Sequence, residues 1–148
     1  MKKVIMIMSI LLLGCNDNVQ VREVKVQYVI DPSILEYVLD FQRDVESVGL
    51  AIENDNISFS VILGRLPDNV AGMAIGMFNP YCVNIIISED IWRLLDRSER
   101  KALIYHELAH DVFELHHNTC RVMTGGLRGF GPSAYRELLD TLIKQQNK

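Results

Sequence analysis

The stretch from Ser98 to about residue 115 most constrains this chain, because it predicts a helix that carries two histidines on one face. His106 and His110 are four residues apart, so a helix brings their side chains about one turn from each other. Two imidazoles at this spacing can bind one Zn²⁺ at about 2.0–2.1 Å. Glu107 lies beside that face, where a general base could take a proton from a water molecule on the metal. The alternative interpretation is an ordinary solvated helix face.

A third metal ligand has to come from outside this helix, since a catalytic zinc usually has three protein ligands and one open position. His116 and His117 are the nearest candidates along the chain. An acidic residue of the last predicted helix, such as Glu137, is another candidate. Spacing alone does not choose among these residues.

The segment HELAHDVFELHH resembles the metzincin pattern HExxHxxGxxH, in which the third histidine follows the second by six residues. Counted from His110, that histidine is His116. Metzincins also place a methionine turn below the metal, and Met123 stands in a similar place. The resemblance implies a zinc-dependent peptidase in which Glu107 is the general base.

One departure from this pattern concerns the third ligand. The glycine of the family, which lets the chain leave the helix sharply, is Phe113 here, and a phenylalanine at positive φ would be strained. A later turn would bring His117 rather than His116 to the metal. The chain also resembles small metallopeptidase-like proteins of bacteroidetes and their phages. In their pattern the last histidine aligns with His117, and a methionine follows six residues later, as Met123 does. We therefore predict His106, His110 and His117 as ligands, with His116 as the alternative to His117.

Residues 71–78, AGMAIGMF, predict a strand interrupted by glycines. The metzincin resemblance implies a strand at the edge of the cleft that pairs with extended substrate through backbone hydrogen bonds. Gly72, Met73 and Ala74 are then candidate substrate-binding residues, since Gly72 and Gly76 would allow a close approach. The alternative is an interior strand weakened by glycine.

The order of the predicted elements indicates an α+β fold with a small mixed sheet. The apolar pattern and the turn residues predict, in order, a strand near residues 19–28, a helix opened by Asp31-Pro32 and ended by Gly49, strands at 57–63, 71–78 and 81–88, a short helix at 91–95, a long helix from Ser98, and a last helix from Pro132 to about Gln145. The metzincin resemblance implies a twisted sheet with an N-terminal helix, a long active-site helix and a C-terminal helix.

Residues 1–15, MKKVIMIMSILLLGC, resemble a bacterial lipoprotein signal peptide. Lys2 and Lys3 are basic, and the apolar run at 4–13 is too short to span a bilayer comfortably. The resemblance implies cleavage after residue 14, several acyl chains on Cys15 that give stable membrane attachment, and a bacterial cell-envelope location, periplasmic or on the outer surface. A tether at 15–18 would precede one domain at 19–148. The alternatives are a plain signal peptide and an N-terminal anchor helix.

The charge balance bears on the partners of the chain. Removal of residues 1–14 takes away Lys2 and Lys3 and no acidic residue, so the formal net charge of −4 becomes −6. A mildly acidic, mixed surface argues against a nucleic-acid partner. We expect a monomer whose partners are a peptide or protein substrate and a membrane reached through the lipid on Cys15. Cys82 and Cys120 could form a disulfide in an oxidising compartment, or remain buried thiols.

The leading functional hypothesis is a membrane-tethered zinc peptidase that hydrolyses peptide bonds with a metal-activated water and Glu107 as general base. One alternative is a gluzincin-like hydrolase with an acidic third ligand. The other is a non-enzymatic lipoprotein on the same scaffold, which the presence of Glu107 disfavours.

Overall fold

The computed structural model describes residues 28–52, 58–76, 79 and 82–147. The predicted signal peptide, the lipid-attachment residue Cys15, the tether and residues 19–27 of the first predicted strand lie outside this part of the chain. No helix in the described residues is both long and apolar enough to cross a membrane.

Four strands in the described residues form one mixed sheet. They are β1 (Tyr28–Ile30), β2 (Ser58–Gly64), β3 (Gly72–Ala74) and β4 (Cys82–Ser88). The spatial order is β1-β2-β4-β3, with β1, β2 and β4 parallel and β3 antiparallel to β4 at one edge. Phe59 and Val61 of β2 and Ile85 and Ile87 of β4 are fully buried, whereas the residues between them are partly exposed. One face of the sheet is therefore the floor of the core.

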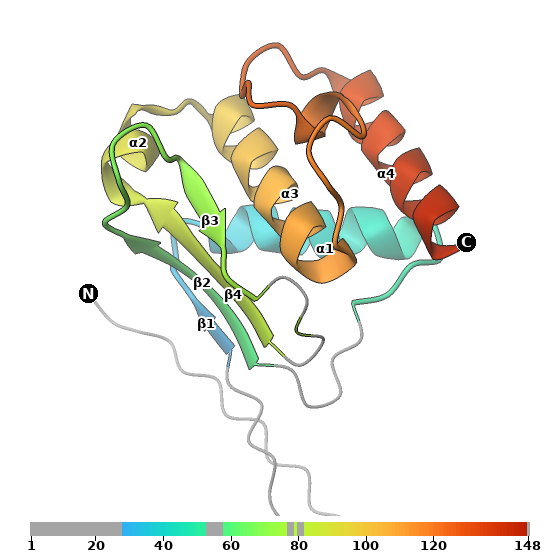
Figure 1. The fold of residues 1–148 in the computed structure, drawn as a ribbon, viewed down its shortest axis with the longest axis horizontal. Helices are drawn as coiled ribbons and strands as arrows, with labels where there is room; N and C mark the ends of the chain where they lie inside the picture. The colour runs from blue at the N-terminus through green and yellow to red at the C-terminus, as the bar shows by residue number, and fades with distance from the viewer. Residues whose placement is uncertain (1–27, 53–57, 77–78, 80–81, 148) are drawn as a thin grey trace, which may run out of the picture.

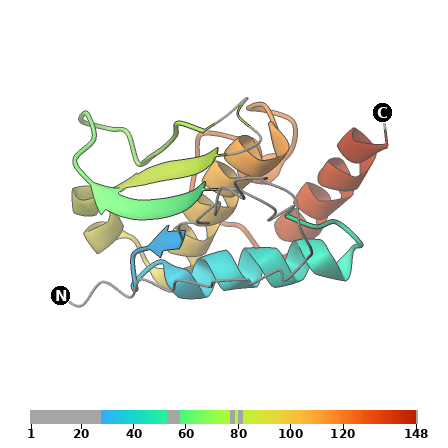
Figure 2. The same cartoon turned by 90° about the horizontal axis from the view of Figure 1, so that it is seen from below.

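The helices occupy the side of the sheet that these buried residues face. They are α1 (Leu35–Ser47), α2 (Glu89–Leu94), α3 (Arg97–Phe113) and α4 (Pro132–Gln146), with a short 3₁₀ turn, η1 (Arg121–Met123), before α4. α3 lies between the sheet and α4, and α1 crosses behind it (Figure 1). In the view from below, the strands lie together at one side and α4 stands at the opposite end (Figure 2). The predicted α+β class with a small mixed sheet is confirmed.

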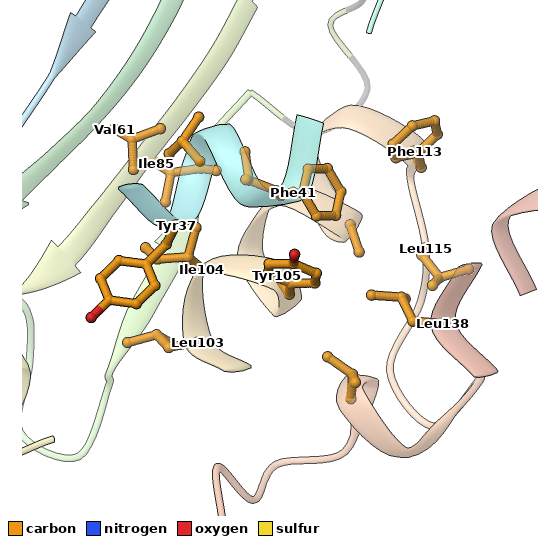
Figure 3. Packing of buried hydrophobic residues seen from close by; sticks show 14 of the residues in the cluster. Tyr37, Phe41, Val61, Ile85, Leu103, Ile104, Tyr105, Phe113, Leu115 and Leu138 are labelled. Carbon is orange, nitrogen blue, oxygen red and sulfur yellow. The ribbon is translucent and has the colours of Figure 1, made fainter. Parts of the chain in front are cut away.

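α3 is the central element of the core, because every residue from 102 to 111 is buried. Tyr105 lies next to Phe41 of α1 (Figure 3) and packs edge-on against it, with ring centroids 5.1 Å apart. It packs in the same way against Tyr135 of α4, at 5.0 Å. Its hydroxyl donates a hydrogen bond of 2.6 Å to Oδ2 of Asp44. Aromatic pairs of this geometry contribute about 0.5–1.5 kcal/mol beyond the area they bury. The packing therefore fixes the helix that carries the predicted site.

Two predicted helix starts were wrong, because one aspartate holds a turn before its helix and another caps its helix earlier than predicted. α1 begins at Leu35 and not at Pro32, because Asp31 accepts hydrogen bonds from the backbone and hydroxyl of Ser33. α3 begins before Ser98, because residues 96 and 99 form a capping box with two hydrogen bonds of 2.9 Å. The end of α1 is as predicted, since Gly49 takes a φ of 78° there.

Candidate metal centre

Three imidazole rings converge beside the C-terminal half of α3. The Nε2 atom of His106 lies 3.1 Å from that of His110 and 3.2 Å from that of His117, and the last two are 3.0 Å apart. His106 and His110 are buried, and His117, from the loop after α3, is exposed. In the part of the chain that the structure describes, these are the residues whose ligand atoms converge closely enough to share a metal ion.

The spacing of the three nitrogens fits a tetrahedral metal ion. Ligands about 2.0–2.1 Å from zinc in this geometry are about 3.3 Å from each other, close to the observed distances of 3.0–3.2 Å. Nδ1 of His106 is 2.8 Å from the carbonyl oxygen of Val122, which only accepts hydrogen bonds. Nδ1 therefore carries the hydrogen, and Nε2 keeps its lone pair. A cation between the nitrogens would relieve the repulsion of their converging lone pairs, so the residues fit zinc.

Burial keeps the two helical imidazoles neutral. The pKa of His106 is lowered mainly by burial and also by His117, against the raising effect of the bond to Val122. Burial first, and then His106 and His117, lower the pKa of His110 to about 4. Nδ1 of His110 is buried, and no described residue forms a hydrogen bond of good geometry with it. The nearby Leu115 backbone partly opposes the lowering of the His110 pKa. Both rings are thus in the neutral form that binds a metal at pH 7.

The end of α3 explains why His117 reaches the other two rings. A phenylalanine at position 113 keeps the helical conformation, and Glu114 is the first residue in the left-handed region, with a φ of 53°. The chain therefore leaves the helix one residue later than a glycine at 113 would allow. The histidine that joins the triad is correspondingly one residue later than His116, which is exposed and lies outside the group. A left-handed residue other than glycine costs about 1 kcal/mol, which the surrounding packing must offset.

The turn η1 connects the triad to the rest of the fold. The carbonyl of Val122 accepts the bond from His106, and the carbonyl of Met123 accepts one of 3.0 Å from the N–H of Asn118, the residue after His117. Met123 itself is fully buried. The predicted methionine turn is thus a buried turn that contacts the triad. The contact is made by the main chain of Val122, which no side-chain pattern in the sequence could have shown.

Glu107 lies on the sheet side of α3, against β3. A Cβ atom added to Gly72 would be only 2.5 Å from Oε1 of Glu107, so the carboxylate fills the space that a side chain at 72 would need. Burial, and then the charge of Asp111, raise the pKa of Glu107 to about 7, against a hydrogen bond from the Ala74 backbone. A carboxyl group with this pKa can both take up and release a proton near neutral pH. The predicted strand and the predicted base are therefore neighbours.

Asp111 is a second buried carboxylate, which the sequence pattern did not single out. Its Oδ2 atom accepts a hydrogen bond of 2.7 Å from the backbone N–H of Asn84 in β4. Burial raises the pKa of Asp111 to about 6, and the bond to Asn84 opposes this shift. Asp111 follows Glu107 by one helical turn, so both residues face the sheet. Its spacing of four residues from Glu107, which places both carboxylates on one side of the predicted helix, is the signal that could have revealed it.

The alternative metal ligand Glu137 and the two cysteines predicted as a possible disulfide all lie apart from the triad. Glu137 forms an ion pair with Arg121, in which Nε of Arg121 is 2.5 Å from Oε2 of Glu137. Glu137 does not belong to the group of converging ligand atoms. Cys82 and Cys120 are free thiols, the first partly exposed and the second buried, so the structure holds no disulfide between them.

Together these residues define a candidate trihistidine metal centre, built on one central helix and the loop that follows, and the same helix carries the buried carboxylate of Glu107. Comparison of the chain with protein-family models, with curated proteins and with solved structures found no match.

Proposed function

We propose that this protein is a zinc-dependent peptidase of the metzincin-like type. The observation that carries the proposal is the convergence of three imidazole nitrogens, from His106, His110 and His117, on the helix that also carries the buried carboxylate of Glu107. Three histidine ligands leave one coordination position for water or substrate, which distinguishes a catalytic from a structural zinc site. The paired Glu137 gives no support to an acidic third ligand.

The proposed reaction is the hydrolysis of a peptide bond. Zinc held by the three imidazoles would polarise the scissile carbonyl and lower the pKa of a bound water to about 7. Glu107 takes a proton from the attacking water, whose oxygen forms a bond to the carbonyl carbon. As the carbon–nitrogen bond breaks, Glu107 gives this proton to the leaving nitrogen, which restores the carboxylate. The Val122 carbonyl orients the His106 ring throughout.

β3 is the proposed substrate-binding strand. It lies at the edge of the sheet, and Gly72 and Ala74 both adjoin Glu107. A peptide that adds to this edge by backbone hydrogen bonds would pass directly beside the base.

We further propose that the protein acts at a bacterial cell envelope, attached to the membrane by lipid on Cys15. The support is the order of the basic residues Lys2 and Lys3, the apolar run at 4–13 and the cysteine. A domain at 19–148 would then meet its peptide substrates close to a membrane surface.

Zinc is expected to bind one equivalent and to raise the melting temperature. At about 100 times its Kd, a ligand of the native state adds about 2.7 kcal/mol to the free energy of unfolding. For a domain of this size that corresponds to roughly 10 °C. Metal analysis and thermal unfolding measure the binding, and a mixed peptide library measures hydrolysis, which a chelator should abolish. Mg²⁺, which prefers oxygen ligands, is the control. A zinc-independent melting temperature would contradict the metal site, and a zinc-loaded but inactive protein would contradict the peptidase.

Gly72→Ala is expected to lower peptide hydrolysis by roughly 100-fold without loss of zinc. The added Cβ would lie within 2.8 Å of Oε1, Cδ and Cγ of Glu107, so this side chain must turn away from the reacting atoms. Because the obstructed group is a side chain, the fold should persist. Gly126→Ala is the matched control, since a Cβ there meets nothing within 4 Å. Steady-state kinetics and zinc content measure the effect, and unchanged activity in Gly72→Ala would show that the carboxylate position is not critical.

A further inference from the structure

The open side of β3 offers main-chain hydrogen-bonding groups. The Ile75 N–H donates to the Asn84 carbonyl at 2.7 Å, and the Ala71 carbonyl accepts from the Ser88 N–H at 2.9 Å. The main-chain groups of the odd-numbered residues therefore point toward β4. Main-chain groups alternate in direction along an antiparallel strand, so those of residues 72 and 74 point away from β4. The Ala74 N–H already donates to the carboxylate of Glu107, which leaves the N–H and C=O of Gly72 and the C=O of Ala74 for another chain. Among the described residues, no strand pairs with this side of β3.

The side chains of β3 and of the two residues that follow it, Ile75 and Gly76, are divided between two faces. A Cβ on Gly72 would meet Glu107, and one on Gly76 would lie 2.8 Å from Oδ1 of Asp111, so the even-numbered positions face α3. Met73 and Ile75 therefore face the opposite side of the sheet, where they are 39% and 52% exposed.

This edge lacks the protection that exposed strand edges usually have. Proteins protect such edges with charged residues or proline, but residues 71–76, AGMAIG, contain neither. Met73 and Ile75 instead place two large apolar side chains in solvent within three residues of each other. An edge of this kind favours pairing with another extended chain.

We propose that β3 selects an extended peptide with apolar side chains at two alternate positions, those opposite Met73 and Ile75. Residues directly opposite in a strand pair have their side chains on the same face, in contact with each other. The peptide residues between them would face α3, which carries Glu107, His106 and His110. Met73 and Ile75 are thus specificity-determining residues. The inference rests on the proposed peptidase function and adds a substrate class to it.

A peptide fits this edge better than a second copy of the chain does. The strand spans only three residues, whereas a stable protein–protein interface buries about 1,200–2,000 Å². A substrate needs only short-lived pairing, and its carbonyl would gain further contacts at the metal centre. The carboxylate of Glu107 also adjoins the same edge, so whatever pairs with β3 lies within reach of the base.

The test uses full-length, zinc-loaded protein and ten-residue alanine-based peptides that carry one Leu, Lys or Glu at each position in turn. We expect the wild type to prefer Leu at two positions that are two residues apart. Met73→Lys should change the preference from Leu to Glu at one of them, and Ile75→Lys at the other, each by roughly fivefold. Cleavage rates measure the effect, and fluorescence anisotropy with the Glu107→Gln protein measures binding without cleavage.

Leu94→Lys is the matched control, because Leu94 is an apolar residue of α2 that is 84% exposed and lies outside β3. It should leave both preferences unchanged. If a lysine variant unfolds, Met73→Thr and Ile75→Thr replace it, with loss of the Leu preference expected.

Wild-type protein that holds zinc but cleaves no peptide would overturn the proposed function. Cleavage with the same preferences in wild type and variants would overturn this inference alone. A wild-type dimer that Met73→Lys dissociates, without any peptide preference, would assign the edge to a second copy and also overturn it.

Discussion

Glu107→Gln is expected to reduce peptide hydrolysis by about 10²–10⁴-fold while the protein keeps its zinc. The amide has nearly the shape of the carboxylate, but it cannot take a proton from water or pass one to the leaving nitrogen. Glu107 is not among the three residues whose nitrogens converge, so metal affinity should be almost unchanged. Steady-state rates on a cleaved peptide and zinc content measure the two effects.

The matched control for this change is Glu46→Gln, which makes the same chemical substitution at an exposed position of α1. It should alter neither rate nor zinc content. Hydrolysis that survives Glu107→Gln would rule out this residue as the base. A combined loss of zinc and activity would instead mean that the carboxylate helps to hold the metal.

His117→Ala is expected to lower zinc affinity by more than about 100-fold, with the loss of hydrolysis that follows. Substitution of residues that only orient a ligand already costs about 10–100-fold, and His117 supplies one of the three nitrogens itself. His116→Ala is the matched control, because it removes the neighbouring exposed imidazole from the same loop. It should leave the affinity within about threefold of the wild type, a change below 1 kcal/mol.

Competition with a chromogenic chelator measures both affinities. Loss of zinc in His116→Ala and not in His117→Ala would reverse the assignment. Unchanged affinity in both variants would mean that the third ligand lies elsewhere, and Glu137→Ala would then be the next variant to examine.

The helical part of the site is the part that local sequence predicts well. His106, Glu107 and His110 lie within one and a half turns of α3, and covalent geometry sets their relative directions once the helix forms. The capping box at residues 96 and 99 and the burial of all residues from 102 to 111 both favour that helix. The α+β class and the mixed sheet could be predicted for a similar reason, because the strand and helix periods are properties of short segments.

Partners that lie far apart in the sequence depended on tertiary packing. The bond that the Asn84 N–H donates to Asp111 joins residues 27 apart, and the bond from His106 to the Val122 carbonyl joins residues 16 apart. Neither main-chain partner carries a side-chain signal. Gly72 illustrates the same limit, since the sequence suggests a close approach there, whereas the structure shows that the approaching group is the carboxylate of Glu107.

By itself, the sequence determined which helix carries the site and which two histidines and one glutamate it presents, because spacing along a helix follows from its backbone geometry. Phe113 indicated that the chain turns late, but it could not fix where the loop returns. The tertiary structure decided that His117 joins the triad and His116 does not. The physical reason is that Glu114 takes the left-handed turn and that the buried turn η1 bonds to both His106 and Asn118, which holds the returning loop in place.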